Sequence, residues 1–153
     1  MEEREKLVGV LNDLIRINYD RTEGYQKAVE ELKISDIDLK TLFTNMSTAS
    51  IQFANELKTE VAKLGAEPAK DSTQSGKVYR VWKDIRATAS ARDRKSIIAL
   101  CEFGEDAAQK AYDAALSSDA QLSADVRQLI MDQKSSLKKS HDRIKALRDK
   151  QPS

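Results

Sequence analysis

The sequence has very little of the residues that build disulfides, metal clusters and tight turns. Its 153 residues include one cysteine, Cys101, and one histidine, His141. A single cysteine excludes an internal disulfide and a thiolate-rich zinc or iron–sulfur site, and a single histidine excludes any motif that needs two. Five glycines, two prolines and 5% aromatic residues provide little turn chemistry for a β-sheet. These absences favour an all-helical protein.

Long apolar runs and an excess of one charge are also missing. No run approaches the ~20 apolar residues that a membrane span needs, and the first residues are mostly charged. The 26 Lys and Arg residues against 25 Asp and Glu give a formal net charge of +1, which argues against binding nucleic acid through bulk charge. The unpaired cysteine suits a reducing compartment. We therefore expect a cytoplasmic protein with no membrane and no nucleic-acid partner.

What the sequence does contain is apolar residues with a period close to 3.6 along most of the chain. In the first helix this stripe passes through the polar residues Asn18 and Arg21. The segment Ser35–Asp38 resembles a capping box at the start of the second helix, and Gly65 stands where a glycine commonly ends one. The expected long helices cover about 4–33, 36–64, 92–117 and 123–149.

The connections between these helices predict their topology. Short connections make the first and second helices antiparallel neighbours, and likewise the third and fourth. The stretch between the second and third holds a loop, about 66–76, and a short amphipathic helix, about 77–88, with Trp82 packed on the bundle. It is long enough to cross from one end of the bundle to the other. We therefore predict one all-α domain over 1–153, a four-helix bundle with a long crossover; an up-down-up-down bundle is the alternative.

Five segments carry a family resemblance that extends over nearly the whole chain. They are Leu11–Ile15, Glu23–Tyr25, Val61–Gly65, Cys101–Ala108 and His141–Ile144. On these segments the chain resembles a bacterial family of ferritin-like four-helix-bundle proteins of unknown function. The resemblance implies the ferritin-like fold and no particular activity; only the wider superfamily suggests a role in stress or iron handling.

The residues that a ferritin-like di-iron centre requires are incomplete. Such a centre takes a Glu from each of two helices and a Glu-x-x-His from each of the other two. Here Lys138 stands three residues before His141, and no Glu-x-x-His occurs. A polar layer that fixes helix register is our favoured interpretation, with Asn18, Glu105 and Gln133 as its members. The alternative is a divergent iron or manganese site, with ligands Glu56, Glu105 and His141.

Other chemistry-bearing residues have simpler interpretations. Cys101 lies on an apolar stripe and is expected to be a buried, unreactive thiol. The basic end of the last helix can bind an anionic surface, but its charges scatter around the helix and suit solvent exposure. We therefore expect a non-enzymatic binding protein without a cofactor.

Several apolar residues lie away from the expected core stripes, which indicates an interface. They are Ile51 in the second helix and Ile98 and Phe103 in the third. Long bundles commonly bury such residues against a copy of themselves. The sequence thus predicts a homodimer with its interface on the second and third helices.

Overall fold

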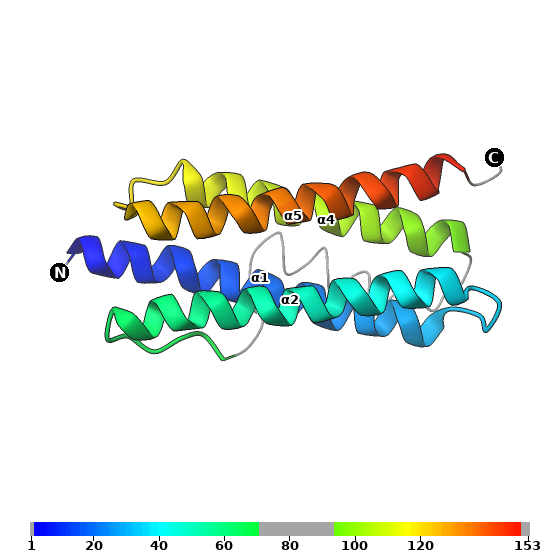
Figure 1. The fold of residues 1–153 in the computed structure, drawn as a ribbon, viewed down its shortest axis with the longest axis horizontal. Coiled ribbons are helices and arrows are strands. Elements are labelled where there is room, and N and C mark those ends of the chain that lie inside the picture. Colours follow the sequence, from blue (N-terminus) through cyan, green and yellow to red (C-terminus); the bar gives the residue numbers. More distant parts are fainter. Residues whose placement is uncertain (1, 71–93, 151–153) are drawn as a thin grey trace.

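Four long helices make up most of the computed structural model, which describes residues 2–70 and 94–150 (Figure 1). The helices are α1 (Glu2–Glu31), α2 (Ile37–Lys63), α4 (Arg94–Leu116) and α5 (Ala124–Asp149). Each of the four predicted long helices is confirmed, with ends within two residues of those expected. The predicted short helix at 77–88, including Trp82, lies outside the described residues.

The helix directions confirm the predicted crossover. In Figure 1, α1 and α5 run in one direction along the bundle, and α2 and α4 run in the other. Because α2 ends at one end of the bundle and α4 starts at the other, the chain between them must connect opposite ends. α1 packs chiefly on α2, α4 packs chiefly on α5, and further contacts join α1 to α4 and α2 to α5. The molecule is thus an all-α, four-helix bundle with ferritin-like connectivity.

The core consists of two apolar clusters with a polar layer between them. One cluster contains Leu11, Leu57 and Ile130, and the other contains Phe43 and Ile97. The stretches of helix between the clusters contribute most of the buried polar side chains, which are Asn18, Asp20, Arg21, Ser47, Ser50, Glu102 and Glu105. Gln133 is also buried, between Ile130 and Leu137 of the first cluster. The mid-bundle section is therefore where unusual chemistry is concentrated.

The helix ends follow local sequence signals, with one exception. Gly65 has a φ of 75°, as a left-handed C′ glycine should, so that prediction is confirmed. The Ser123 side chain accepts a hydrogen bond from the Val126 amide (3.2 Å) and caps α5. The predicted capping box at Ser35–Asp38 is wrong, because Asp36 caps α2 without a side-chain bond to the helix. Its carboxylate and that of Asp38 bind Arg94 instead.

In the ranges 2–70 and 94–150, none of the helices combines the length and apolar character needed to cross a bilayer.

Candidate functional site

A buried cation, Arg21, lies at the centre of the mid-bundle layer. It is only 1% exposed. Its Nε donates to Oε1 of Glu105 on α4 (2.9 Å), and its Nη2 lies 2.7 Å from the same oxygen. Its Nη1 donates to the Ser50 hydroxyl on α2 (2.6 Å), and Ser50 in turn donates to the Met46 carbonyl (3.0 Å). The guanidinium thus ties three helices together.

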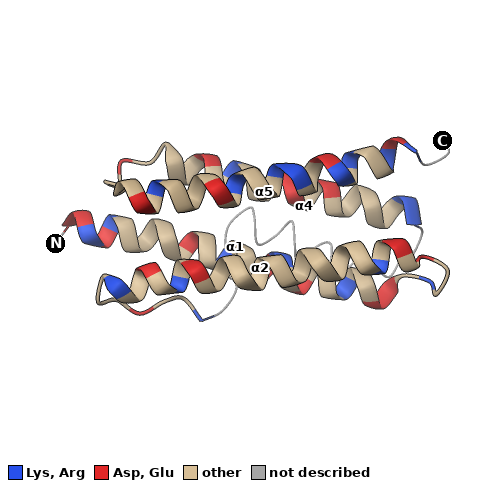
Figure 2. Cartoon of the chain, viewed as in Figure 1, with Lys and Arg blue, Asp and Glu red and all other residues tan. Residues whose placement is uncertain are grey.

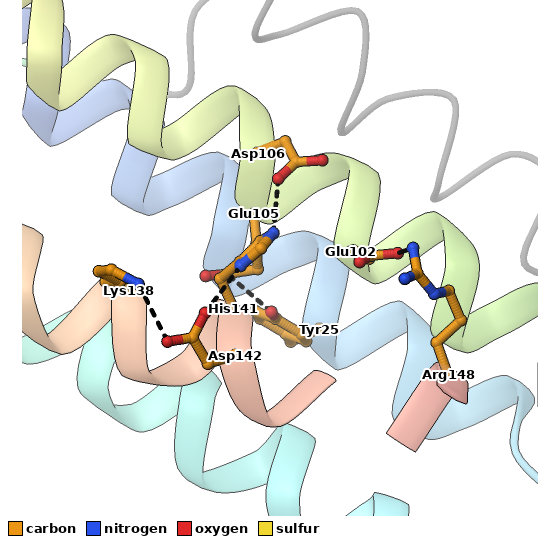
Figure 3. A network of polar contacts seen from close by, with 8 residues as sticks. All are labelled: Tyr25, Glu102, Glu105, Asp106, Lys138, His141, Asp142 and Arg148. Carbon is orange, nitrogen blue, oxygen red and sulfur yellow. Dashed lines mark hydrogen bonds and ion pairs between the residues drawn. The ribbon is translucent and has the colours of Figure 1, made fainter. Parts of the chain in front are cut away.

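Tyr25 completes this set of four residues, which we call the Arg21 cluster (Arg21, Tyr25, Ser50 and Glu105). Its hydroxyl donates to Glu105 Oε1 at 2.6 Å (Figure 3). Its ring centroid lies 5.5 Å from the guanidinium carbon of Arg21, within cation–π range. Glu105 Oε1 therefore receives hydrogen bonds from two side chains of α1. Oε2 of Glu105 has no hydrogen-bond partner within the described part of the chain.

The ionisation of the cluster follows from its burial and its charges. Burial alone lowers the pKa of Arg21, but the negative charge of Glu105 and the hydrogen bond to it reverse that effect, and the net pKa is raised. Burial, and then the charge of Glu105, raise the pKa of Tyr25 well above its ordinary value. At neutral pH the Arg21 guanidinium is therefore charged and the Tyr25 phenol is neutral.

A second hydrogen-bonded group, the Tyr112 chain, lies beside the Arg21 cluster. It consists of Asn18, Tyr112, Gln133 and Glu56. Asn18 donates to the Tyr112 hydroxyl (2.9 Å), and that hydroxyl donates to Gln133 Oε1 (2.6 Å). Gln133 Nε2 donates to Glu56 Oε1 (3.0 Å) and to the Phe53 carbonyl (3.3 Å). This chain connects all four helices through side chains.

The expected polar layer is thus divided between two groups. Asn18 and Gln133 belong to the Tyr112 chain, whereas Glu105 belongs to the Arg21 cluster. Within such a layer, the amides of Asn18 and Gln133 could supply the hydrogen-bond donors for the Glu105 carboxylate. Those donors come from Arg21 and Tyr25 instead, and the carboxylate bonded to Gln133 is that of Glu56.

The mid-bundle residues do not fit the di-metal centre that the fold suggests. Glu56, Glu105 and His141 are not brought together, since each binds different side chains. In residues 2–70 and 94–150, no group of three His, Cys, Asp or Glu side chains is arranged to hold a metal ion. The charge of Glu105 is balanced by the protein's own cation, because the Arg21 guanidinium lies 2.7 Å from its Oε1.

His141 belongs to a separate, more exposed contact between α4 and α5. Its Nε2 lies 2.6 Å from Oδ1 of Asp106, and its Nδ1 lies 3.3 Å from Oδ1 of Asp142 (Figure 3). Lys138 also binds Asp142 at 3.1 Å. The hydrogen bonds from Lys138, and then from His141, lower the pKa of Asp142. Nearby, Arg148 binds Glu102 at 2.6 Å. The pairs His141–Asp106 and Arg148–Glu102 join α5 to α4, whereas both contacts of Asp142 lie within α5.

The residues missed by sequence reasoning are Arg21, Tyr25 and Tyr112. The signal was present, because all three stand within the apolar stripes of their helices. A charged residue or phenol in such a stripe must find a buried partner. Which partner it finds depends on the relative axial positions of helices distant in sequence, and periodicity does not supply these.

Of the remaining residues singled out in the sequence, two are buried and two are exposed. Cys101 is fully buried, and burial, together with the charge of Glu105, raises its thiol pKa. Ile51 and Phe103 are 45% and 62% exposed. Ile98 is fully buried in the core, so placing it on an exposed interface was wrong. It belongs to the inner stripe because the stripe of α4 is broader than the sequence pattern indicated.

Comparisons with known proteins agree with this fold and leave the activity open. Residues 6–118 match the family described as a domain of unknown function (DUF2383). The chain belongs to this family. A solved structure of a Dps1 point mutant from Mycobacterium smegmatis is similar, with a TM-score of 0.77 and 11% sequence identity over 96% of this chain and 97% of that one. This likeness establishes the ferritin-like fold alone. No curated protein matches.

Proposed function

We propose that this member of the DUF2383 family is a non-enzymatic, self-associating helical bundle whose former metal position holds a fixed ion pair. We place it in the cytoplasm and give it no cofactor. The observation that carries the proposal is the Arg21–Glu105 pair, with Arg21 1% and Glu105 0% exposed. A di-iron centre needs about four carboxylates around its cations. Here one central carboxylate is already neutralised by a guanidinium.

The absence of an enzymatic role is supported by the state of the reactive side chains. Nucleophilic catalysis needs an accessible, activated group close to a base. Cys101 is buried and its pKa is raised, which keeps the thiol protonated. His141 contacts two carboxylates, Asp106 and Asp142, at the seam of α4 and α5. Such an arrangement serves well as a link between helices.

Metal content after loading tests the proposal. The protein is purified without chelator, loaded anaerobically with Fe²⁺ or Mn²⁺, desalted and measured by elemental mass spectrometry. We expect well under one ion per chain, and the same value for Glu105→Gln, which removes the central carboxylate charge. The exposed Glu23→Gln is the matched control for unspecific surface binding.

The alternative function is a divergent iron- or manganese-binding protein with an oxidase-like or stress role. Binding of two ions per chain, kept in Glu23→Gln and lost in Glu105→Gln, would establish that alternative.

A further inference from the structure

The middle of α2 presents an outer face that carries no charge. A third of the chain consists of charged residues, yet residues 41–55 contain no Asp, Glu, Lys, Arg or His. We call the exposed residues of this stretch the neutral face; they are Thr41, Thr44, Asn45, Thr48, Ile51, Gln52 and Asn55. Figure 2 shows the middle of α2 without charged residues, whereas charges recur along α5.

Depletion of charge is the compositional mark of an interface core. An exposed helix face that serves only solubility usually carries Lys and Glu. Ile51 on the neutral face is 45% exposed. The Thr48 hydroxyl donates to the Thr44 carbonyl at 3.0 Å, so its hydrogen is used within the helix. This part of the surface therefore has little to attract ions or charged partners.

A shallow groove runs beside the neutral face, along the seam between α1 and α2. Val29 of α1 and Thr44, Thr48 and Ile51 of α2 are among the residues that line it. Glu30 of α1 stands on its rim and lies 3.9 Å from Lys27. Apart from Gln26 and Glu30, the groove is lined by small and apolar side chains, so it can accept one aliphatic side chain from a partner.

We infer that the neutral face binds the neutral face of a second copy of this chain, through a two-fold axis that passes near Thr48. This inference rests on the proposed self-association and gives it a surface. A two-fold interface must be complementary to itself, and a face without charges avoids placing like charges opposite each other. A charged partner would find no counter-charge among the residues of the neutral face itself.

The residue spacing agrees with an antiparallel pairing of the two α2 helices. With Thr48 on the axis, residue 51 of one copy lies level with residue 45 of the other, and 44 lies level with 52. Ile51 of each copy then stands next to the groove segment lined by Thr44 and Thr48 of its partner. Thr41 and Asn55 meet at the ends, so every pair in the contact is uncharged.

One helix face gives an interface at the small end of the range for specific complexes. The stretch 41–55 is ~21 Å long at ~1.5 Å per residue. We therefore expect a dimer that dissociates on dilution, with a dissociation constant in the micromolar range. Phe103 on α4, which is 62% exposed, lies outside this contact.

Sedimentation velocity over a dilution series tests the inference with charge variants. Thr48→Lys places two like charges across the axis, and Ile51→Lys removes the side chain that enters the groove. We expect each to raise the dissociation constant at least about tenfold. The matched control is Met131→Lys on α5, whose side chain is 48% exposed and should leave the dimer unchanged. Circular dichroism verifies that each variant keeps its helices and its melting temperature.

A charge-reversal mixture makes the test specific for the axis. Thr48→Lys and Thr48→Glu are each expected to be monomeric, and their equimolar mixture is expected to dimerise. If the wild type dimerises but the Thr48 and Ile51 variants dimerise equally well, the inference is wrong and self-association uses another face. Loss of the dimer in Phe103→Lys alone would place that face on α4. A wild type that stays monomeric at all concentrations would overturn the proposed self-association itself.

Discussion

Arg21 is the charged residue whose burial needs most explanation, because its long cationic side chain is only 1% exposed. A fully buried cation is stable only where opposite charge and hydrogen bonds replace its hydration. Arg21 obtains both from Glu105 at 2.7 Å and from Ser50 at 2.6 Å. The arrangement resembles a metal site in that one cation organises oxygen atoms from several helices. The cation here is covalently part of α1, so the bundle needs no metal to balance Glu105.

Removal of one partner of this pair should be far more harmful than removal of both. Arg21→Met leaves Glu105 as an uncompensated buried charge and should lower the free energy of unfolding by about 3–5 kcal/mol. Replacing both residues in Arg21→Met/Glu105→Met should restore much of that loss. The matched control is Arg16→Met on the same helix, where the arginine is 39% exposed and bonds only to Asp13 within the described residues. Urea unfolding measures all three, and a single variant no worse than the control would contradict the buried ion pair.

Gln133 tests the Tyr112 chain separately. Gln133→Leu removes the acceptor of the Tyr112 hydroxyl and the donor to Glu56. Because the buried Tyr112 hydroxyl then keeps its donor Asn18 but loses its acceptor, we expect a loss of about 1–3 kcal/mol in unfolding free energy. Gln128→Leu is the control on the same helix, where the amide bonds to the exposed Asp132 and, within 2–70 and 94–150, to no other side chain. Equal melting temperatures for the two variants would show that the chain contributes nothing.

At the residue scale, the sequence predicted which polar side chains face the core but not which partners they bind. The inward positions of Asn18, Glu105 and Gln133 follow from turning each residue about 100° around its helix. Their partners do not follow, because a partner depends on side-chain length and on the relative heights of two helices. Arg21 reaches Glu105 across 84 positions of sequence, a relation that no local pattern contains.

At the scale of elements, the sequence predicted the helices well and their junctions less well. Helix ends such as Gly65 and Ser123 are determined by residues within a few positions, so they could be predicted. The start of α2 depends on a residue 58 positions away from Asp36. Arg94, the first residue of α4, binds Asp36 at 2.8 Å and Asp38 at 2.7 Å. These pairs join the α1–α2 turn to α4.

The Arg94 pairs should make the stability of this junction depend on pH. The hydrogen bond from Arg94 is the main cause that lowers the pKa of Asp38 below its usual 3.8. A carboxylate with a lowered pKa in the folded state stabilises the fold above its unfolded pKa, and that contribution is lost as the pH falls through the folded value. We expect Arg94→Met to cost about 0.5 kcal/mol at pH 7, because Asp38 is 58% exposed and its charge is screened by solvent.

The pH profile separates this effect from loss of packing. The difference in unfolding free energy between wild type and Arg94→Met should shrink as the pH is lowered from about 5 to about 2. Urea titrations at each pH provide the comparison. A difference that stays constant across this range would mean that the Arg94 side chain acts through packing and not through its charge.

At the scale of the whole molecule, four apolar stripes and the length of the middle connection were enough to predict the bundle and its crossover. Stripes must be buried against each other, and the connections limit which helices can be neighbours. Function was less predictable, since a ferritin-like fold supports many activities and the site decides among them. The site became visible only with Arg21 and Glu105 in contact. Likewise, the sequence shows that the stretch 41–55 is uncharged, but only the structure shows which of its residues are exposed on α2.

Thermal unfolding with and without metal tests most directly whether the Arg21–Glu105 ion pair stands in place of a metal. A metal bound by the native state at 100 times its dissociation constant adds about 2.7 kcal/mol of stability, which raises the melting temperature of a domain of this size by several degrees. If the Arg21–Glu105 pair fills the metal position, the melting temperature will be the same in chelator and in saturating Fe²⁺ or Mn²⁺ under anaerobic conditions. A rise of several degrees with metal, absent in Glu105→Gln, would contradict the account.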